Sequence, residues 1–189
     1  MKHILLVDNY DSFTFNLLHC LEKNENVVVT VVRNNHLSNL SVDHYDKIVL
    51  SPGPGLPEEA GDLMPFIEKN YLLKPILGIC LGHQALGQFF GAQLIKLNEV
   101  LHGVQLETKL HNVKGIMNYL PEIIKTGHYH SWVLSEIDFP ECLSITAYNK
   151  QGGIMAFEHK TLAIVGIQFH PESVLTPLGD EILQHWLQS

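Results

Sequence analysis

The stretch Ile76-Leu77-Gly78-Ile79-Cys80-Leu81-Gly82 decides how this sequence folds. Its first four residues form a short, fully apolar run, which is typical of a strand buried on both faces of a parallel sheet. The residues that follow have the spacing of a helix, with apolar side chains at Ala85, Leu86, Phe89 and Phe90. A buried strand that passes directly into a helix is the repeating unit of an α/β fold.

The segments that precede this stretch repeat the same alternation. Apolar or β-branched runs occur at Ile4–Val7, Val27–Val32 and Ile48–Leu50, and a helical pattern with Phe13, Leu17, Leu18 and Leu21 follows a polar turn. Alternating strands and helices predict an open, mostly parallel twisted sheet with helices on both faces. Ligands of such sheets bind at the carboxyl ends of the strands.

The pattern changes after Gly91. Shorter strands are predicted at Ala92–Ile95, Val104–Leu110, Ser144–Tyr148 and Ile154–Phe157, and they indicate a smaller antiparallel portion. A longer buried strand is predicted at Leu162–Phe169. Thr176 and Pro177 have the residue types of an N-cap and first turn, so they predict the start of a terminal helix. No repeat or linker divides the chain, and we expect one domain over residues 1–189.

The composition excludes several classes of protein. The chain has 189 residues, 46% of them hydrophobic, and a net charge of −8, which disfavours binding to a phosphate backbone. Its three cysteines show no CxxC pair, so neither a disulfide framework nor a metal site is expected. No stretch approaches the ~20 apolar residues of a spanning helix. We therefore expect a cytoplasmic protein that binds neither membrane nor nucleic acid.

Cys80 stands at the centre of a G-x-C-x-G pentapeptide. Glycines at these two positions permit a sharp strand-to-helix turn that exposes the middle side chain, and this is the pattern of a nucleophile elbow. The positive end of the following helix would favour a thiolate. The alternative is a buried structural cysteine, which is the commoner fate of this residue type.

The Phe169-His170-Pro171-Glu172 segment supplies partners for such a nucleophile. A nucleophilic cysteine needs a base, and the base needs an acceptor that orients it. His170 and Glu172 are two residues apart and share one face of an extended segment. The alternative is an exposed loop with an incidental charge pair. Because the acid follows the histidine, the order of residues disfavours an α/β-hydrolase.

The Pro- and Gly-rich segment Ser51–Gly55 follows the third predicted strand. Runs of this kind are usually ordinary turns. The functional interpretation is that the backbone N–H of Gly53 points at a developing oxyanion, with the N–H of Leu81 as the second donor.

Taken together, the motifs PGPG, GICLGHQ and FHPE resemble those of the class I (triad) glutamine amidotransferases, in the family's order and over nearly the whole chain. The segment Asp8–Thr14 resembles the subgroup that pairs with chorismate-using synthases. These are the glutaminase subunits of anthranilate synthase, in tryptophan biosynthesis, and of aminodeoxychorismate synthase, in folate biosynthesis. The resemblance implies release of ammonia from L-glutamine for a chorismate-binding synthase subunit, most readily that of anthranilate synthase, without a cofactor or metal.

The resemblance also implies roles for individual residues. Cys80 would be the nucleophile, His170 the base and Glu172 its orienter. The residues implied to bind substrate are Gly53, Pro54, Gly55, Leu81, Gln84, Ser131 and Trp132.

The sequence departs from the family's pattern at two positions. Val104 stands where a Lys often follows the His-Gly pair, and His128 stands where an Arg often precedes the Tyr-His-Ser segment. These departures concern coupling to a partner rather than the reaction. Two other functions stay open, namely a stand-alone cysteine hydrolase and a non-catalytic regulatory subunit with the same fold.

Overall fold

The computed structural model describes residues 1–111 and 115–189. Within these residues, nine strands form one sheet in the order β2-β1-β3-β4-β9-β8-β7-β5-β6. The strands are β1 (Lys2–Asp8), β2 (Val27–Arg33), β3 (Lys47–Leu50), β4 (Ile76–Ile79), β5 (Leu94–Leu110), β6 (Ile123–Leu134), β7 (Leu143–Asn149), β8 (Ile154–His159) and β9 (Ile164–Ile167). The α-helices are α1 (Thr14–Glu22), α2 (Leu63–Asn70), α3 (Leu81–Phe89) and α4 (Gly179–Gln188).

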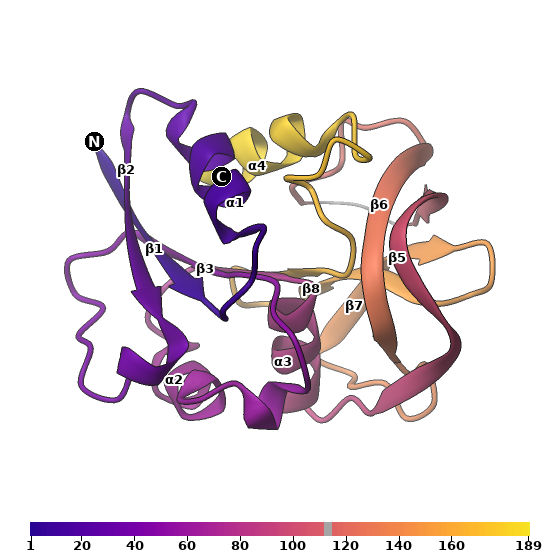
Figure 1. The fold of residues 1–189 in the computed structure, drawn as a ribbon, viewed down its shortest axis with the longest axis horizontal. Helices are drawn as coiled ribbons and strands as arrows, with labels where there is room; N and C mark the ends of the chain where they lie inside the picture. Colours follow the sequence, from indigo (N-terminus) through magenta and orange to yellow (C-terminus); the bar gives the residue numbers. More distant parts are fainter. Residues whose placement is uncertain (112–114) are drawn as a thin grey trace.

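The sheet is mixed. Its half from β2 to β9 is parallel, and the strands from β9 through β8, β7 and β5 to β6 pair antiparallel. The predicted α/β class is therefore confirmed, and the antiparallel portion is more extensive than the sequence suggested. Figure 1 shows α1 and α4 on one face of the parallel half and α2 and α3 on the other.

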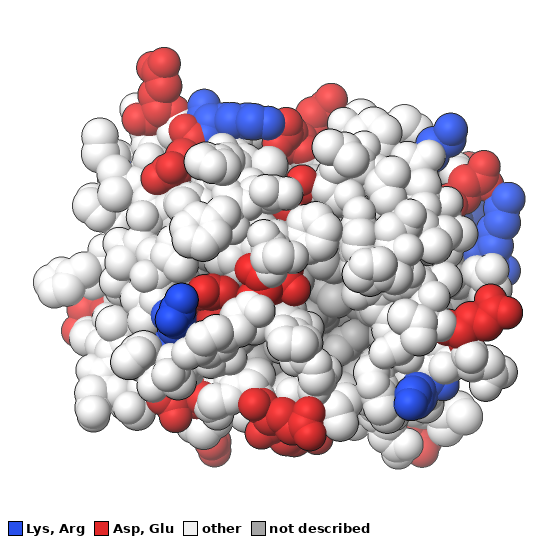
Figure 2. All heavy atoms as spheres, viewed as in Figure 1, with Lys and Arg blue, Asp and Glu red and all other residues white. Residues whose placement is uncertain are grey.

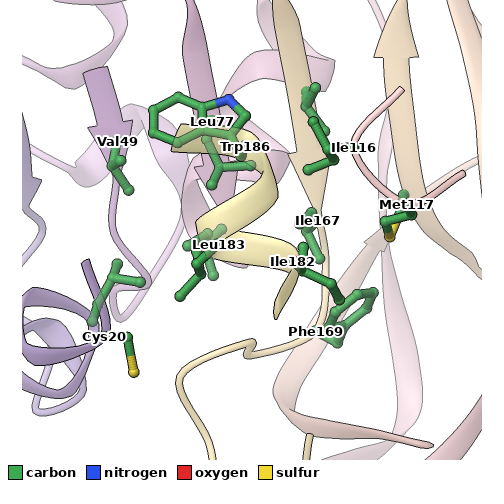
Figure 3. Packing of buried hydrophobic residues seen from close by; sticks show 14 of the residues in the cluster. Cys20, Val49, Leu77, Ile116, Met117, Ile167, Phe169, Ile182, Leu183 and Trp186 are labelled. Carbon is green, nitrogen blue, oxygen red and sulfur yellow. The ribbon is translucent and has the colours of Figure 1, made fainter. Parts of the chain in front are cut away.

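The inner strands are apolar throughout because both of their faces are buried. Successive side chains of a strand point to opposite faces. Ile4 and Leu6 of β1 accordingly pack in the core beneath α1 and α4, which Figure 3 shows around Trp186. Leu5 and Val7 pack in the second core, beneath α2 and α3. This explains why the predicted strands lack the alternation of polar and apolar residues.

The region after Gly91 differs from the prediction. One strand, β5, covers residues 94–110, where two separate strands were expected. It remains one strand because it pairs with β6 along its length, with irregularities near residues 96–104. The sequence did not predict β6 or α2. In Figure 1, β5 and β6 form a long curved ribbon beside the parallel half of the sheet.

Two predicted boundaries near the C-terminal end are wrong. β9 covers only residues 164–167, not 162–169, because its pairings with β4 and β8 end at Ile167. The terminal helix begins at Gly179 rather than at Pro177. Thr176 does not cap it. Its hydroxyl donates to the carbonyl oxygen of His170 at 2.6 Å and accepts from the backbone N–H of Gly127 at 2.9 Å, so it braces the segment after β9.

Charged side chains are spread over the face of the molecule seen in Figure 1. Figure 2 shows that most of the face seen in Figure 1 is uncharged, and that acidic and basic side chains lie around its margins and in one group near its middle. Among the described helices, none has the length and apolar character needed to cross a membrane.

Candidate active site

The site is built where two neighbouring parallel strands end. β4 and β9 pair in register, with Gly78 opposite Gly166 and Ile79 opposite Ile167. The backbone N–H of Cys80 then donates to the carbonyl oxygen of Ile167 at 2.8 Å. Residues that lie almost ninety positions apart in the sequence therefore meet at the carboxyl edge of the sheet, where α/β sheets bind their ligands.

Cys80 occupies a strained turn between β4 and α3. It lies at the N-cap of α3 with φ 51° and ψ −100°, a conformation that non-glycine residues rarely adopt and that costs roughly 1–3 kcal/mol. The flanking glycines allow this turn to pack closely. A Cβ on Gly78 would lie 2.4 Å from the carbonyl oxygen of Gly82, and one on Gly82 would lie 2.5 Å from that of Leu50. The geometry is that of the nucleophile elbow expected from the sequence.

His170 and Glu172 form a buried pair, so this segment is not an exposed loop. The Nδ1 atom of His170 lies 2.6 Å from Oε1 of Glu172, and both residues are less than 10% exposed. The other ring nitrogen, Nε2, is also buried, and among the described residues it has no hydrogen-bond partner of standard geometry. With Nδ1 bound to Glu172, Nε2 is the atom available to the Cys80 sulfur and to a substrate.

Opposing effects act on the charge of His170. Burial is the largest single effect and lowers its pKa, whereas the nearby charge of the Cys80 sulfur, contact with that sulfur and the Glu172 carboxylate all act in the opposite direction. Together they raise the pKa of His170 to about 10. The raised pKa favours a protonated imidazole beside the Cys80 sulfur, and a protonated histidine is a partner that can activate a nucleophilic cysteine.

Aromatic rings fix the orientation of the imidazole. The centre of the His170 ring lies 4.8 Å from the centre of the Tyr129 ring and 5.3 Å from that of the Phe13 ring. Both contacts are roughly edge to face. Phe13 and Tyr129 also contact each other, at 4.8 Å. Phe13 belongs to the segment Asp8–Thr14, and the structure gives that segment a physical role beside the histidine.

The same N-terminal segment holds the Gly53 loop. The side-chain amide of Asn9 donates to the carbonyl oxygen of Ser51 at 2.8 Å, and its backbone N–H donates to the Ser51 hydroxyl at 2.9 Å. A Cβ on Gly53 would lie 2.6 Å from the Cβ of Asn9 and from the Leu81 side chain. Only glycine fits at this position, and the loop lies against the first residue of α3.

A pocket opens beside these groups. It encloses about 150 Å³, less than the roughly 300–1,000 Å³ of drug-sized sites, which suits a small ligand such as an amino acid. Its lining contains all the substrate-binding residues expected from the sequence except Leu81, together with Cys80 and other residues of β5 and β6. The lining residues are Gly53, Pro54, Gly55, Cys80, Gln84, Val100, Tyr129, His130, Ser131 and Trp132.

Gln84 is held by two acceptors at the edge of this pocket. Its Nε2 donates to the carbonyl oxygen of Trp132 at 2.9 Å and to Oε1 of Gln168 at 3.2 Å. Both amide hydrogens are therefore engaged, and the remaining polar atom is Oε1, which can only accept a hydrogen bond. A ligand in the pocket would meet Gln84 as an acceptor for its own N–H groups.

Gln168 is a site residue that the sequence analysis missed. Its Nε2 donates to the sulfur of Cys80 at 3.6 Å, and the residue is fully buried. The available signal was its position two residues before His170, which places both side chains on one face of an extended chain. Its importance depends on the pairing of β4 with β9, which the sequence did not reveal.

Several other features lie apart from this site. A larger cavity of about 260 Å³ at the opposite edge of the sheet, lined in part by Lys47, Glu158 and Trp186, does not include Cys80. Cys20 is buried, and burial raises its pKa to about 12. Within residues 1–111 and 115–189, no cluster of His, Cys, Asp and Glu has the arrangement of a metal site.

The two departures from the expected family pattern face each other. Val104 of β5 pairs with His128 of β6 across the ribbon. Val104 is 36% exposed, whereas His128 is completely buried. One of these positions is therefore accessible to a partner, and the other is part of the interior.

Comparison with known proteins gives one family. The model of the family described as class-I glutamine amidotransferase matches residues 5–189. A Pseudomonas aeruginosa protein named anthranilate synthase component 2 is 40% identical, with 98% of this chain and 94% of that protein covered. A Bacillus subtilis protein named aminodeoxychorismate/anthranilate synthase component 2 is 38% identical, with 98% and 96% covered.

The solved structures give a consistent result. A Thermoplasma acidophilum protein, assigned provisionally as part of a GMP synthase, is similar with a TM-score of 0.88 and 28% sequence identity. The similarity covers 100% of this chain and 93% of that one.

Proposed function

Because this chain belongs to the class-I glutamine amidotransferase family, we propose that it hydrolyses L-glutamine through Cys80, His170 and Glu172 and supplies the ammonia to a chorismate-using synthase. One observation carries the catalytic part of the proposal. A cysteine in a strained elbow lies at the end of β4, and a buried His–Glu pair follows the neighbouring strand β9. Contact between His170 and the Cys80 sulfur helps to raise the pKa of His170.

The first half-reaction forms a thioester. The Cys80 thiolate attacks the carbon of the glutamine side-chain amide, and the carbonyl oxygen becomes an oxyanion. The backbone N–H groups of Gly53 and Leu81 stabilise that charge, each contributing roughly 3 kcal/mol. His170 protonates the leaving nitrogen as the C–N bond breaks, ammonia departs, and a γ-glutamyl thioester remains on Cys80.

The second half-reaction uses the same histidine as a base. Acylation removes the negative charge of Cys80, which is the main factor that raises the pKa of His170, while burial still lowers that pKa. The neutral imidazole then takes a proton from water, the resulting hydroxide attacks the thioester, and glutamate and the thiolate are released. A single change of charge thus converts His170 from acid to base between the two steps.

The partner is proposed from the names of the relatives. Both are named as second components of synthases, one for anthranilate and one for anthranilate and aminodeoxychorismate. We favour the anthranilate synthase of tryptophan biosynthesis and keep the aminodeoxychorismate synthase of folate biosynthesis as the alternative. In either case, the ammonia is used by a chorismate-binding subunit on another polypeptide, and we expect the complex to act in the cytoplasm.

The test measures glutaminase activity with and without each candidate synthase, in the presence and absence of chorismate. The chain alone should be a poor glutaminase, and the correct synthase should raise kcat/KM by roughly 5–150-fold, the usual range of coupling between two sites. Equal kcat/KM in every mixture would favour a stand-alone hydrolase. Absence of activity in every mixture would favour the non-catalytic subunit.

A pair of cysteine variants completes the test. Cys80→Ser should abolish glutamine-dependent synthesis but leave synthesis from ammonium salts intact, because the partner performs the latter reaction. Cys142→Ser is the matched control, since Cys142 is a free cysteine outside the pocket. Retention of glutaminase activity by Cys80→Ser would exclude Cys80 as the nucleophile.

A further inference from the structure

A chain of buried polar side chains runs along β6 toward the glutamine pocket. Thr126, His128 and His130 alternate along the strand and share one face. Nε2 of His128 lies 2.8 Å from the hydroxyl of Thr126, and Nδ1 of His128 lies 3.1 Å from Nε2 of His130. Nδ1 of His130 lies 3.1 Å from the carbonyl oxygen of Trp132, which is the last member of this series of hydrogen-bonded groups.

The last acceptor fixes the position of every proton in this chain. A carbonyl oxygen cannot donate, so His130 must carry its proton on Nδ1, and in a neutral ring its Nε2 is then an acceptor. His128 must donate to that atom, so it too carries its proton on Nδ1. Nε2 of His128 then accepts from the hydroxyl of Thr126 at 2.8 Å, a shorter contact than the 3.4 Å between that hydroxyl and the carbonyl oxygen of Leu106. Thr126 can in turn accept from Thr108, whose hydroxyl lies 2.6 Å away.

The end of the chain coincides with a wall of the pocket. The carbonyl oxygen of Trp132 accepts from both His130 and Gln84. Gln84 also donates to Gln168, which donates to the sulfur of Cys80. The Trp132 carbonyl, which accepts from His130, therefore fixes the side-chain amide of Gln84, and that amide presents its oxygen to a ligand. Through Gln168, the same amide is linked by hydrogen bonds to the Cys80 sulfur.

We propose that His128 is a positioning residue for glutamine binding, because its Nδ1–H donates to Nε2 of His130 and so holds the ring whose own N–H supports the Trp132 carbonyl that orients Gln84. This inference rests on the proposed glutaminase function. His128 does not touch the substrate pocket, whose lining includes His130 but not His128. Its effect is transmitted entirely through His130.

The electrostatic surroundings keep the rings of His128 and His130 neutral. Burial lowers the pKa of His128 to about 3, and the charges of His130 and His170 act in the same direction. Burial also lowers the pKa of His130 to about 4, although its hydrogen bond to Trp132 opposes this change. Both rings are therefore neutral at neutral pH, as the assignment of single tautomers requires.

The first test needs no variant. Long-range ¹H–¹⁵N correlation spectra of the full-length, ¹⁵N-labelled protein at neutral pH distinguish the two neutral tautomers of each histidine. We expect both His128 and His130 to carry the proton on Nδ1. A spectrum with the proton of His130 on Nε2 would overturn the proposal.

The second test compares two variants of nearly the same shape. Asn at position 128 places an amide N–H close to the position of Nδ1, whereas Leu offers no donor. His128→Asn should keep the tautomer of His130 and a KM for glutamine close to that of the parent. His128→Leu leaves Nε2 of His130 buried without a donor, and it should raise KM for glutamine by about tenfold with a smaller change in kcat.

Ammonium-dependent synthesis by the complex is the internal control and should be unchanged in both variants. Equal KM values for the Asn and Leu variants would refute a role for the hydrogen bond, because the two share their effects on packing. If the unmodified protein, with synthase and chorismate, has no glutaminase activity, the proposed function fails. The proposed role of His128 in glutamine binding then fails with it. The spectra distinguish that outcome from failure of the tautomer assignment alone.

Discussion

Replacing Glu172 with Gln would show how far catalysis depends on the charge and orientation of His170. In the parent, Oε1 of Glu172 binds Nδ1 of His170, and Oε2 is buried with no partner among the described residues. If the new carbonyl oxygen faces Nδ1, the amide N–H₂ is buried without an acceptor. If the N–H₂ faces Nδ1, the ring proton must move to Nε2, the atom that faces Cys80. Neither arrangement supports the imidazolium as the carboxylate does.

The size of the effect follows from the contacts. A hydrogen bond to a charged group contributes about 1.5–3 kcal/mol, so we expect kcat to fall by roughly 10–150-fold. The loss should be partial, because Cys80, through its charge and its contact, contributes more than Glu172 to the raised pKa of His170. His170→Ala removes the acid and base altogether and should approach the loss caused by Cys80→Ser.

The pH dependence has a definite sign. Glu172 helps to raise the pKa of His170 to about 10, and the imidazolium is lost as pH rises through that value. Without the carboxylate the pKa is lower, so the alkaline limb of glutaminase activity should move to lower pH. Each unit of movement corresponds to about 1.4 kcal/mol.

The assay is steady-state glutaminase kinetics of the complex across neutral and alkaline pH, with thermal unfolding as the control for folding. If Glu172→Gln were as damaging as His170→Ala in a folded protein, Glu172 would have more than an orienting role. If the alkaline limb did not move, the carboxylate would not act on the charge of His170.

Two further predictions concern the nucleophile and the oxyanion. A diazoketone analogue of glutamine should label Cys80 and neither of the other two cysteines, and peptide mapping that found the label elsewhere would contradict the assignment. Gly53→Ala should lower kcat by roughly 10²–10³-fold, because its new Cβ would lie 2.8 Å from the backbone oxygen of Asn9 and the loop would have to shift. An unchanged kcat in this variant would exclude the Gly53 N–H as an oxyanion donor.

The sequence predicted the parallel half of the sheet well because the signals there are local. Runs such as Ile4–Val7 and Ile76–Ile79 are short and wholly apolar, and a strand buried on both faces requires just such a run. The elbow was also predictable. Two glycines that flank Cys80 at the junction of a strand and a helix indicate a sharp, closely packed turn. The structure shows contacts there that leave no room for a larger side chain.

The ribbon of β5 and β6 was predicted poorly because its signals are not local. Only the ends of β6 join the apolar cores, through Ile124, Val133 and Leu134. Its middle consists of polar and aromatic residues and one glycine, and the buried side chains there bond polar partners. A hydrophobic pattern cannot reveal such a strand. The start of α4 was misplaced for a related reason. Thr176 has the residue type of an N-cap, but its hydroxyl bonds His170 and Gly127.

By itself, the sequence determined the fold class, the candidate nucleophile and the candidate histidine and carboxylate, because glycine, proline and apolar spacing restrict the backbone locally. Only the tertiary structure decided that Cys80 and His170 meet, since their proximity depends on the pairing of β4 with β9. The tertiary structure also decided that Gln168 contacts the Cys80 sulfur and that His128 contacts His130. The physical reason is that a buried polar group needs hydrogen-bond partners, and the fold decides which groups lie within reach. Here the partners lie on a different strand or on the same face of the same strand.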